Sequence, residues 1–128
     1  MHKPIEPASV FKSKAPTSLA NLTEGTRQLH ISGQTPVDSD GKNVGRGDIQ
    51  TQVTQVLQNF TNIVEAGGAS VQDVCRITVY LLRREDLPAV MEARSQVFQA
   101  PYPATTVAIV SGLANPDWLV EIEGLAVF

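Results

Sequence analysis

The chain has 128 residues, enough for one domain with its own hydrophobic core. Hydrophobic residues make up 42% and charged residues 18%, which indicates a globular protein rather than a disordered one. The formal net charge is −3 and the ten Lys and Arg are scattered, so the composition argues against binding to nucleic acid.

The first seven residues lack the apolar core of a signal peptide, and no apolar run is long enough to span a bilayer. The single cysteine, Cys75, excludes an internal disulfide and suits a reducing compartment. We therefore expect a cytoplasmic protein with no membrane partner.

Residues 1–20 are rich in Pro, Ser and Lys and are interpreted as an irregular arm, in which a short strand is expected, if anywhere, at residues 9–12. Residues 26–34 form the first firm strand, and Pro36 starts a loop. Residues 38–42 are a turn, because their Asp and Gly supply the required dihedral angles. The Gly comes too early for a calcium loop and no Glu follows at the required distance, so we expect no metal site.

Residues 48–66 carry the strongest helical pattern, with apolar residues spaced three and four apart. Asp48 is expected to cap the amino end, and Gly67-Gly68 to end the helix. The other face is polar, nearly uncharged and interpreted as solvated; its amide residues are Gln50, Gln52, Gln55, Gln58, Asn59 and Asn62.

Residues 74–83 predict a strand in which Cys75, Ile77, Val79 and Leu81 share the core face. A second helix is predicted over residues 87–98, capped by Asp86. Arg94 is the one charged residue on its otherwise apolar inner face. A β-branched run at residues 104–110 predicts another strand.

The last ten residues predict a strand with two different faces. Val120, Ile122, Ala126 and Phe128 make a core face, whereas the other face holds Glu121 and Glu123 among apolar neighbours. Two helices cover only one face of such a sheet, so the semi-apolar second face needs protein to cover it. Its members are Thr78, Tyr80, Leu119, Leu125 and Val127. We infer a single α+β domain over residues 1–128, with room for a hairpin before its first firm strand, that forms a homo-oligomer.

Glu121 and Glu123 are the candidates for acid–base chemistry, provided that desolvation raises one of their pKa values. The alternative is that the two carboxylates are solvated or form ion pairs across an interface, and for Glu123 we favour this alternative. No motif places a nucleophile beside a base, and His30 is interpreted as an ordinary strand residue.

Several segments together resemble the Rid family of reactive intermediate deaminases, also called YjgF-like proteins. They are Ile31–Pro36, the end of the first helix through Gly68, residues 71–74 and 78–81, Tyr102-Pro103-Ala104, and residues 120–127. The resemblance implies a chorismate-mutase-like fold with a mixed sheet and two helices on one face. It also implies a homotrimer with a central barrel and ligand clefts between subunits. Typical members hydrolyse small enamines and imines to ketones and ammonia without a cofactor.

The resemblance assigns roles residue by residue. A backbone group of Gly33 would meet the substrate, and Glu121 would position the attacking water. The expected substrate-binding set is Ser32, Gly33, Thr105, Thr106 and Arg94.

This chain departs from the family pattern at the position just after Pro-Ala, where family deaminases have an arginine that grips the substrate carboxylate and this chain has Thr105. Threonine cannot make that bidentate pair, so the chain resembles an arginine-less branch. The usual family cysteine is replaced by Val107, and the usual tyrosine of the arm by Leu19.

Two functions therefore stay open. One is an enamine or imine hydrolase with an atypical substrate, or with Arg94 or Arg76 as a substitute cation. The other is a non-catalytic ligand-binding or accessory trimer on the same scaffold. A ribonuclease is the weakest reading, because the charge is −3 and no nucleophile–base pair is visible.

Overall fold

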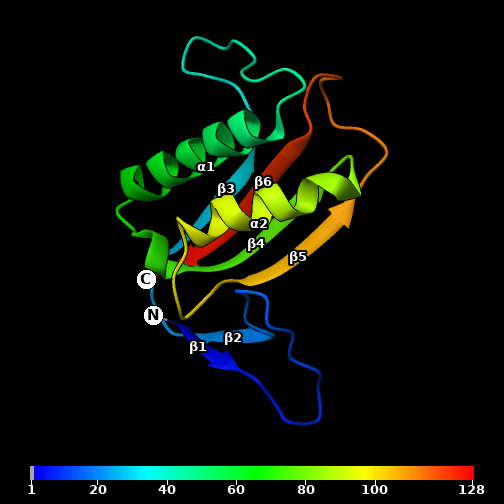
Figure 1. The fold of residues 1–128 in the computed structure, drawn as a ribbon. Coiled ribbons are helices and arrows are strands. Elements are labelled where there is room, and N and C mark those ends of the chain that lie inside the picture. The colour runs from blue at the N-terminus through cyan, green and yellow to red at the C-terminus, as the bar shows by residue number, and fades with distance from the viewer. Residues whose placement is uncertain (1) are drawn as a thin grey trace.

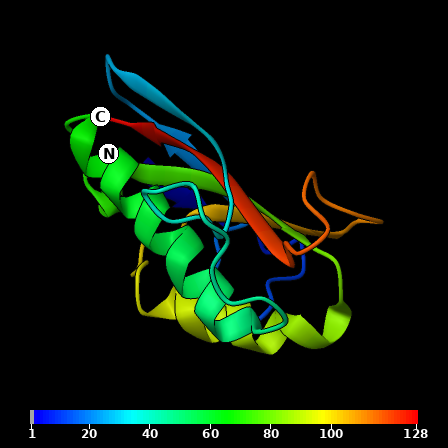
Figure 2. The same cartoon turned by 90° about the horizontal axis from the view of Figure 1, so that it is seen from above.

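A four-stranded mixed sheet with two helices on one face forms the body of the molecule in the computed structural model, which describes residues 2–128 (Figure 1). The strands lie in the order β3 (Gln28–Gln34), β6 (Val120–Val127), β4 (Val74–Leu81) and β5 (Ala104–Ile109). β6 pairs antiparallel with both β3 and β4, whereas β5 pairs parallel with β4. The predicted α+β architecture, with both helices on one side of the sheet (Figure 2), is confirmed.

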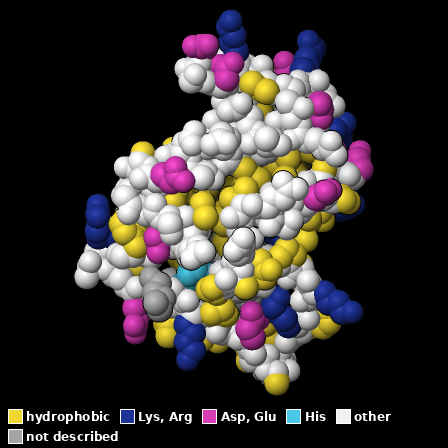
Figure 3. All heavy atoms as spheres, turned by 60° about the vertical axis from the view of Figure 1, so that its left-hand side comes forward, with side chains coloured by type: hydrophobic (Ala, Val, Ile, Leu, Met, Phe, Trp, Pro, Cys, Tyr) yellow, Lys and Arg dark blue, Asp and Glu magenta, His cyan; other side chains and the backbone are white. Residues whose placement is uncertain are grey.

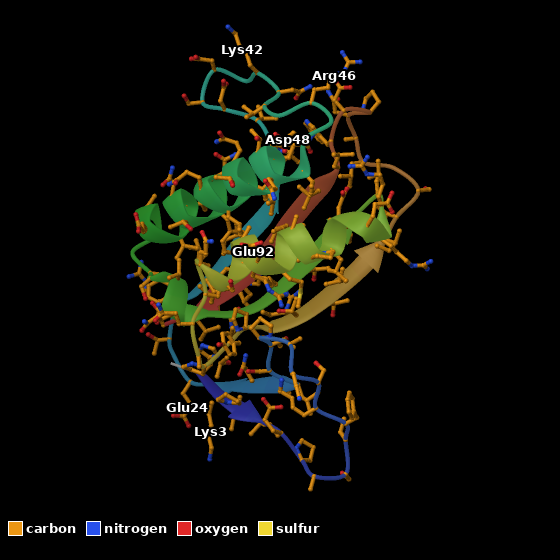
Figure 4. All side chains as sticks on the ribbon, in the orientation of Figure 1. Lys3, Glu24, Lys42, Arg46, Asp48 and Glu92 are labelled. Carbon is orange, nitrogen blue, oxygen red and sulfur yellow. The ribbon has the colours of Figure 1, made fainter. Side chains whose placement is uncertain are left out.

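Helix α1 (Ile49–Ala66) begins and ends where the sequence predicts. The carboxylate of Asp48 accepts hydrogen bonds from the backbone N–H of Gln50 and of Thr51, so it caps the amino end of the helix (Figure 4). At the other end Gly68 has a φ of +86°, the left-handed conformation that glycine adopts without strain.

The core lies between the two helices and the sheet. The apolar stripe of α1 packs against alternate residues of β4 and β6, with Phe60 fully buried and its ring edge-on to that of Phe98. The fully buried strand residues are Val74, Ile77, Val79, Leu81, Val120, Ile122 and Ala126. The alternation predicted for β4 and β6 therefore decides which of their residues face the helices.

The amino-terminal arm differs from the prediction. Residues 9–12 form no strand; instead β1 (His2–Ile5) pairs antiparallel with β2 (Ala20–Thr23). This pair lies beside one end of the main sheet (Figure 1). The hydroxyl of Ser18 donates to the carbonyl of Tyr102 at 2.7 Å, which ties the arm to the start of β5. A local sequence pattern could not reveal this partner, because it lies 84 residues away.

Helix α2 (Leu87–Ser95) is shorter than predicted; Asp86 occupies its N-cap position, as predicted, but its side chain makes no capping hydrogen bond. The Asp86 carboxylate instead accepts two hydrogen bonds from the guanidinium of Arg83, at 2.9 and 3.1 Å. A bidentate arginine is a stronger partner for a carboxylate than a backbone N–H, which explains the error. Two short 3₁₀ helices, η1 (Val71–Asp73) and η2 (Arg84–Asp86), precede β4 and α2.

Two buried strand residues also depart from the sequence-based assignment. A bulge between Val74 and Arg76 adds one residue to β4, so Val74 joins the core cluster in the place predicted for Cys75. Cys75 is still buried, and its thiol lies 3.4 Å from the carbonyl oxygen of Leu125. Val127, predicted to face a second subunit, is already buried within the protomer.

None of the helices within residues 2–128 is long and apolar enough to cross a membrane.

Candidate functional site

The face of the sheet turned away from the helices carries both carboxylates of β6. Across the ladder to β4, Tyr80 lies opposite Glu121 and Thr78 lies opposite Glu123. The side chains of residues paired in this way point to the same face of a sheet. The hydrophobic alternation of β4 and β6 thus places polar groups together on this face, which we call the open face.

Glu121 lies against the backbone of Gly33 at the end of β3. A Cβ atom built on Gly33 would lie 2.8 Å from the carboxyl carbon of Glu121, closer than real Cβ contacts allow. Only a residue without a side chain leaves room for the carboxyl group at this position. The structure therefore brings together Gly33 and Glu121, which the sequence-based expectation placed at one site.

Glu121 has the electrostatic environment of an acid–base group. Burial raises the pKa of its carboxyl, and the negative charge of Glu123 raises it further. No hydrogen bond from residues 2–128 lowers this pKa, because burial and Glu123 are its two causes. Such a carboxyl exchanges a proton nearer to neutral pH than a solvated glutamate does.

Glu123 has a different environment two residues along the same strand. The hydroxyl of Tyr80 donates a hydrogen bond to its Oε1 at 3.1 Å. This bond is the main reason that the pKa of Tyr80 is raised, with burial as the second cause. The two carboxylates therefore differ in their contacts: Glu123 accepts a hydrogen bond from Tyr80, whereas Glu121 lies against the backbone of Gly33.

Two amide side chains of α1 hold the backbone on either side of the site, a role that the sequence did not reveal. Gln52, interpreted as solvated, is only 1% exposed and bonds to the backbones of Gly45, Asp117 and Leu119. Its Oε1 accepts from the N–H of Leu119 at 2.8 Å, two residues before Glu121. The spacing held a signal, because residue 52 lies on the same helical stripe as the apolar residues 49, 53, 56 and 60.

Asn59 does the same for the segment that follows Gly33. Its Nδ2 donates to the carbonyls of Thr35 and Val37, at 3.1 and 2.8 Å, and its Oδ1 accepts from Gln55. The polar face of α1 is thus partly a set of ties between the helix and the two strands that form the site.

The remaining predicted site residues do not all meet Glu121 in one protomer. Ser32 lies next to Gly33 and is exposed on the open face. Thr106 lies opposite Thr78 in the ladder and shares that face, whereas Thr105 lies opposite Ile77 and points to the helix side. The side chains of Thr105 and Glu121 therefore project from opposite faces of the sheet.

Arg94 is also on the helix side of the sheet. It lies on the inner face of α2, is only 3% exposed, and its Nε has no hydrogen-bond partner within residues 2–128. Burial lowers the pKa of its guanidinium. The structure thus separates Arg94 from the open face on which Glu121 lies.

Replacing Gly33 with alanine is expected to push the Glu121 carboxyl aside without removing it. A displacement of about 1 Å at a reacting group can cost roughly 100-fold in rate, so we expect kcat to fall by about 10- to 100-fold. Steady-state kinetics of imine hydrolysis would measure this. Gly112→Ala is the matched control, because a Cβ atom there meets nothing within 4 Å. Equal activity of the two variants would show that the position of Glu121 is unimportant.

Hollows along the two helices lie away from this site. A groove of about 350 Å³ runs between α1 and α2, lined in part by Leu57, Val71, Ala93 and Val97. Figure 3 shows hydrophobic side chains gathered in a furrow between polar, mostly uncharged surfaces. No group of three or more His, Cys, Asp or Glu residues within residues 2–128 is arranged to hold a metal ion.

Comparison with known proteins gives consistent matches over nearly the whole chain. The model of the family described as endoribonuclease L-PSP matches residues 12–128. A RutC family protein of Pyrococcus horikoshii is 35% identical over 120 residues, covering 91% of this chain and 94% of its own. A protein of Dermatophagoides farinae named 2-iminobutanoate/2-iminopropanoate deaminase is 29% identical over 99 residues, covering 77% of each chain.

Solved structures agree with these matches. A Rid family protein of unknown function from Yersinia pestis superposes with a TM-score of 0.91 at 30% identity. The alignment covers 99% of this chain and 98% of the other.

Proposed function

Since this chain belongs to the Rid family, also described as YjgF or endoribonuclease L-PSP, we propose that it hydrolyses a small enamine or imine to a ketone and ammonia without a cofactor. The observation that carries this proposal is the partly buried Glu121 carboxyl, with its raised pKa, against the backbone of Gly33. The deaminase name of the relative from Dermatophagoides farinae supports the same reaction class.

One carboxyl group suffices for this chemistry. The neutral acid form of Glu121 gives its proton to the β-carbon of the enamine, which converts the enamine into an iminium ion. The resulting carboxylate then takes a proton from water as the water oxygen attacks the iminium carbon. Collapse of the adduct releases ammonia and leaves the ketone, so that one water is consumed for each enamine. A raised pKa suits both steps, because the group must be an acid first and a base afterwards.

We further propose that the site is completed by a neighbouring subunit in a homotrimer. Thr105 and Glu121 project from opposite faces of one protomer, so they meet only if two protomers contribute to one cleft. Val107 and Ile109 of β5 are 36% and 43% exposed, an apolar edge that supports such a contact. Light scattering at micromolar concentration tests this, and a monomer would contradict it.

The second candidate, a non-catalytic ligand-binding trimer, is favoured by one observation. Thr105 stands where the resemblance expects a carboxylate-binding arginine, and Arg94 lies on the opposite face from Glu121. Ribonuclease activity, which the family description names, has less support, since the net charge is −3 and the open face carries two carboxylates.

The test is to generate 2-aminoacrylate with a dehydratase and to measure pyruvate release with and without the protein. We expect the protein to accelerate pyruvate release, and the absence of acceleration would contradict the hydrolase proposal for this substrate.

Thr105→Arg is expected to raise kcat/KM by about 10-fold or more, because a charge-assisted contact to the carboxylate contributes roughly 1.5–3 kcal/mol. An inactive wild type with an active Thr105→Arg variant would favour the ligand-binding alternative for the natural protein.

A further inference from the structure

A hollow of about 200 Å³ opens on the open face, lined by the residue before Gly33 in β3 and by Glu123, two residues from Glu121 in β6. Its lining residues come from three neighbouring strands and are His30, Ile31, Ser32, Arg76, Glu123 and Gly124. Ser32 connects the hollow to the site, because it directly precedes Gly33. The volume is enough for a molecule of a few heavy atoms.

The hollow holds one full charge of each sign. Arg76 lies opposite Leu125 and Thr78 lies opposite Glu123, so Arg76 and Glu123 are diagonal neighbours on one face of the sheet. Diagonal neighbours lie roughly 7–8 Å apart, within reach of long side chains. The ion pairs found within residues 2–128 are Arg46–Asp117 and Arg83–Asp86, and neither involves Arg76 or Glu123.

Tyr80 supplies a reason why the two charges stay apart. It is the diagonal neighbour of Glu123 on the side away from Arg76, and its hydroxyl donates to Oε1 at 3.1 Å. Glu123 is therefore held toward Tyr80, while the guanidinium of Arg76 has no hydrogen-bond partner among residues 2–128. A held carboxylate and a guanidinium with no ion-pair partner within residues 2–128 thus line the same hollow.

We propose that this hollow binds a small zwitterion, with its carboxylate on Arg76 and its nitrogen cation on Glu123. A lone carboxylate would meet the charge of Glu123, and a lone cation would meet that of Arg76, so a molecule with both charges is selected. The inference rests on the proposed function in one respect: the protonated form of a 2-imino acid carries this pair of charges. It assigns the carboxylate to Arg76 and leaves the buried Arg94 without a role in binding.

The experiment compares three small molecules that differ only in their charged groups. Alanine has both charges, propionate lacks the ammonium group, and ethylamine lacks the carboxylate. Chemical-shift titration by NMR at pH 7 and constant ionic strength would give each Kd. We expect alanine to bind at least about tenfold more tightly than either partial ligand, as two charge-assisted contacts should exceed one. Affinity for alanine no greater than for the other two overturns the proposal.

Two variants assign the charges to their residues. Arg76→Gln is expected to weaken alanine binding and to tighten ethylamine binding, because the charge that repels a lone cation is gone, so that the preference for alanine over ethylamine is lost. Glu123→Gln is expected to lower the affinity for alanine to the affinity for propionate. Arg84→Gln, at an exposed arginine of η2, is the matched control and should change none of the three affinities. If Arg76→Gln weakens alanine and ethylamine equally, or neither of them, Arg76 is not the carboxylate site.

These measurements read binding and not turnover. If the protein binds alanine through Arg76 but releases no pyruvate, only the hydrolase proposal is contradicted. The opposite result is a protein that releases pyruvate, equally well after Arg76→Gln, and that binds alanine no more tightly than propionate or ethylamine. This result would contradict only the zwitterion site.

Discussion

Replacing Glu121 with glutamine is expected to lower kcat for imine hydrolysis by about 100-fold or more, because general acid–base groups contribute roughly 10²–10⁴ in rate. Glutamine keeps the size of the side chain and its fit beside Gly33 but cannot exchange the proton. Steady-state pyruvate release would measure the loss. Unchanged kcat would show that Glu121 takes no part in the reaction.

The same substitution is expected to make the folded protein more stable at neutral pH. The fold raises the pKa of Glu121 above its ordinary value of 4.5, so it favours the neutral carboxyl over the carboxylate. Well below pH 4.5 the group is neutral in both the folded and unfolded states and contributes nothing. As the pH rises through 4.5 toward the folded pKa and beyond it, the unfolded state gains from ionisation and stability is lost. Glutamine avoids this loss.

Urea unfolding at pH 7 and at pH 4 would separate the two effects. We expect Glu121→Gln to exceed the wild type in free energy of unfolding at pH 7, with a smaller difference at pH 4. Glu92→Gln, on the exposed face of α2 (Figure 4), is the control and should change neither stability nor kcat. A variant that is less stable than the wild type at pH 7 would contradict the desolvated environment of Glu121.

The substitution Gln52→Leu is expected to cost about 3 kcal/mol of folding free energy. Leucine fills a similar volume but leaves the carbonyl of Asp117 and the N–H of Leu119 without the partner that Gln52 supplies, whereas the carbonyl of Gly45 still accepts from the N–H of Asp48. Each buried polar group that loses its hydrogen bond costs roughly 1–3 kcal/mol, and entry of water would recover part of that cost. Urea unfolding at one protein concentration would measure the change.

Gln58→Leu is the matched control on the same helix. Gln58 is exposed and, within residues 2–128, its Nε2 bonds only to the side chain of Asn62, so its replacement should change stability by less than about 0.5 kcal/mol. Equal losses in the two variants would show that Gln52 does not tie α1 to the backbone before β6. Because Leu119 is two residues from Glu121, we also expect Gln52→Leu to reduce kcat in the fraction that remains folded.

Periodicity in the sequence predicted the two strands that carry the candidate site. Alternation along residues 120–127 separates Ile122 from Glu121, and the same alternation in β4 places Tyr80 on the face of Glu121. The bulge in β4 is different. One extra residue moved Val74 into the core in place of Cys75, and no pattern within the strand indicates where a bulge occurs.

Tertiary partners account for the other differences. The amide face of α1 looks solvated in a helical projection, yet Gln52 and Asn59 meet the backbone of loops that the projection does not contain. Likewise Asp86 bonds to Arg83 instead of capping α2. The faces of Thr105 and Thr106 depend on the register of β5 against β4, which sequence alone leaves open.

A pH titration of the Glu121 side chain tests the central claim most directly. The ¹³C shift of its carboxyl carbon can be followed by NMR from pH 3 to pH 8, with the signal assigned by its absence in Glu121→Gln. A desolvated carboxyl beside Gly33 and Glu123 predicts a midpoint above 4.5, and a lower midpoint once Gly33→Ala pushes the group toward solvent. A midpoint at or below 4.5 in the wild type would contradict the acid–base role assigned to Glu121.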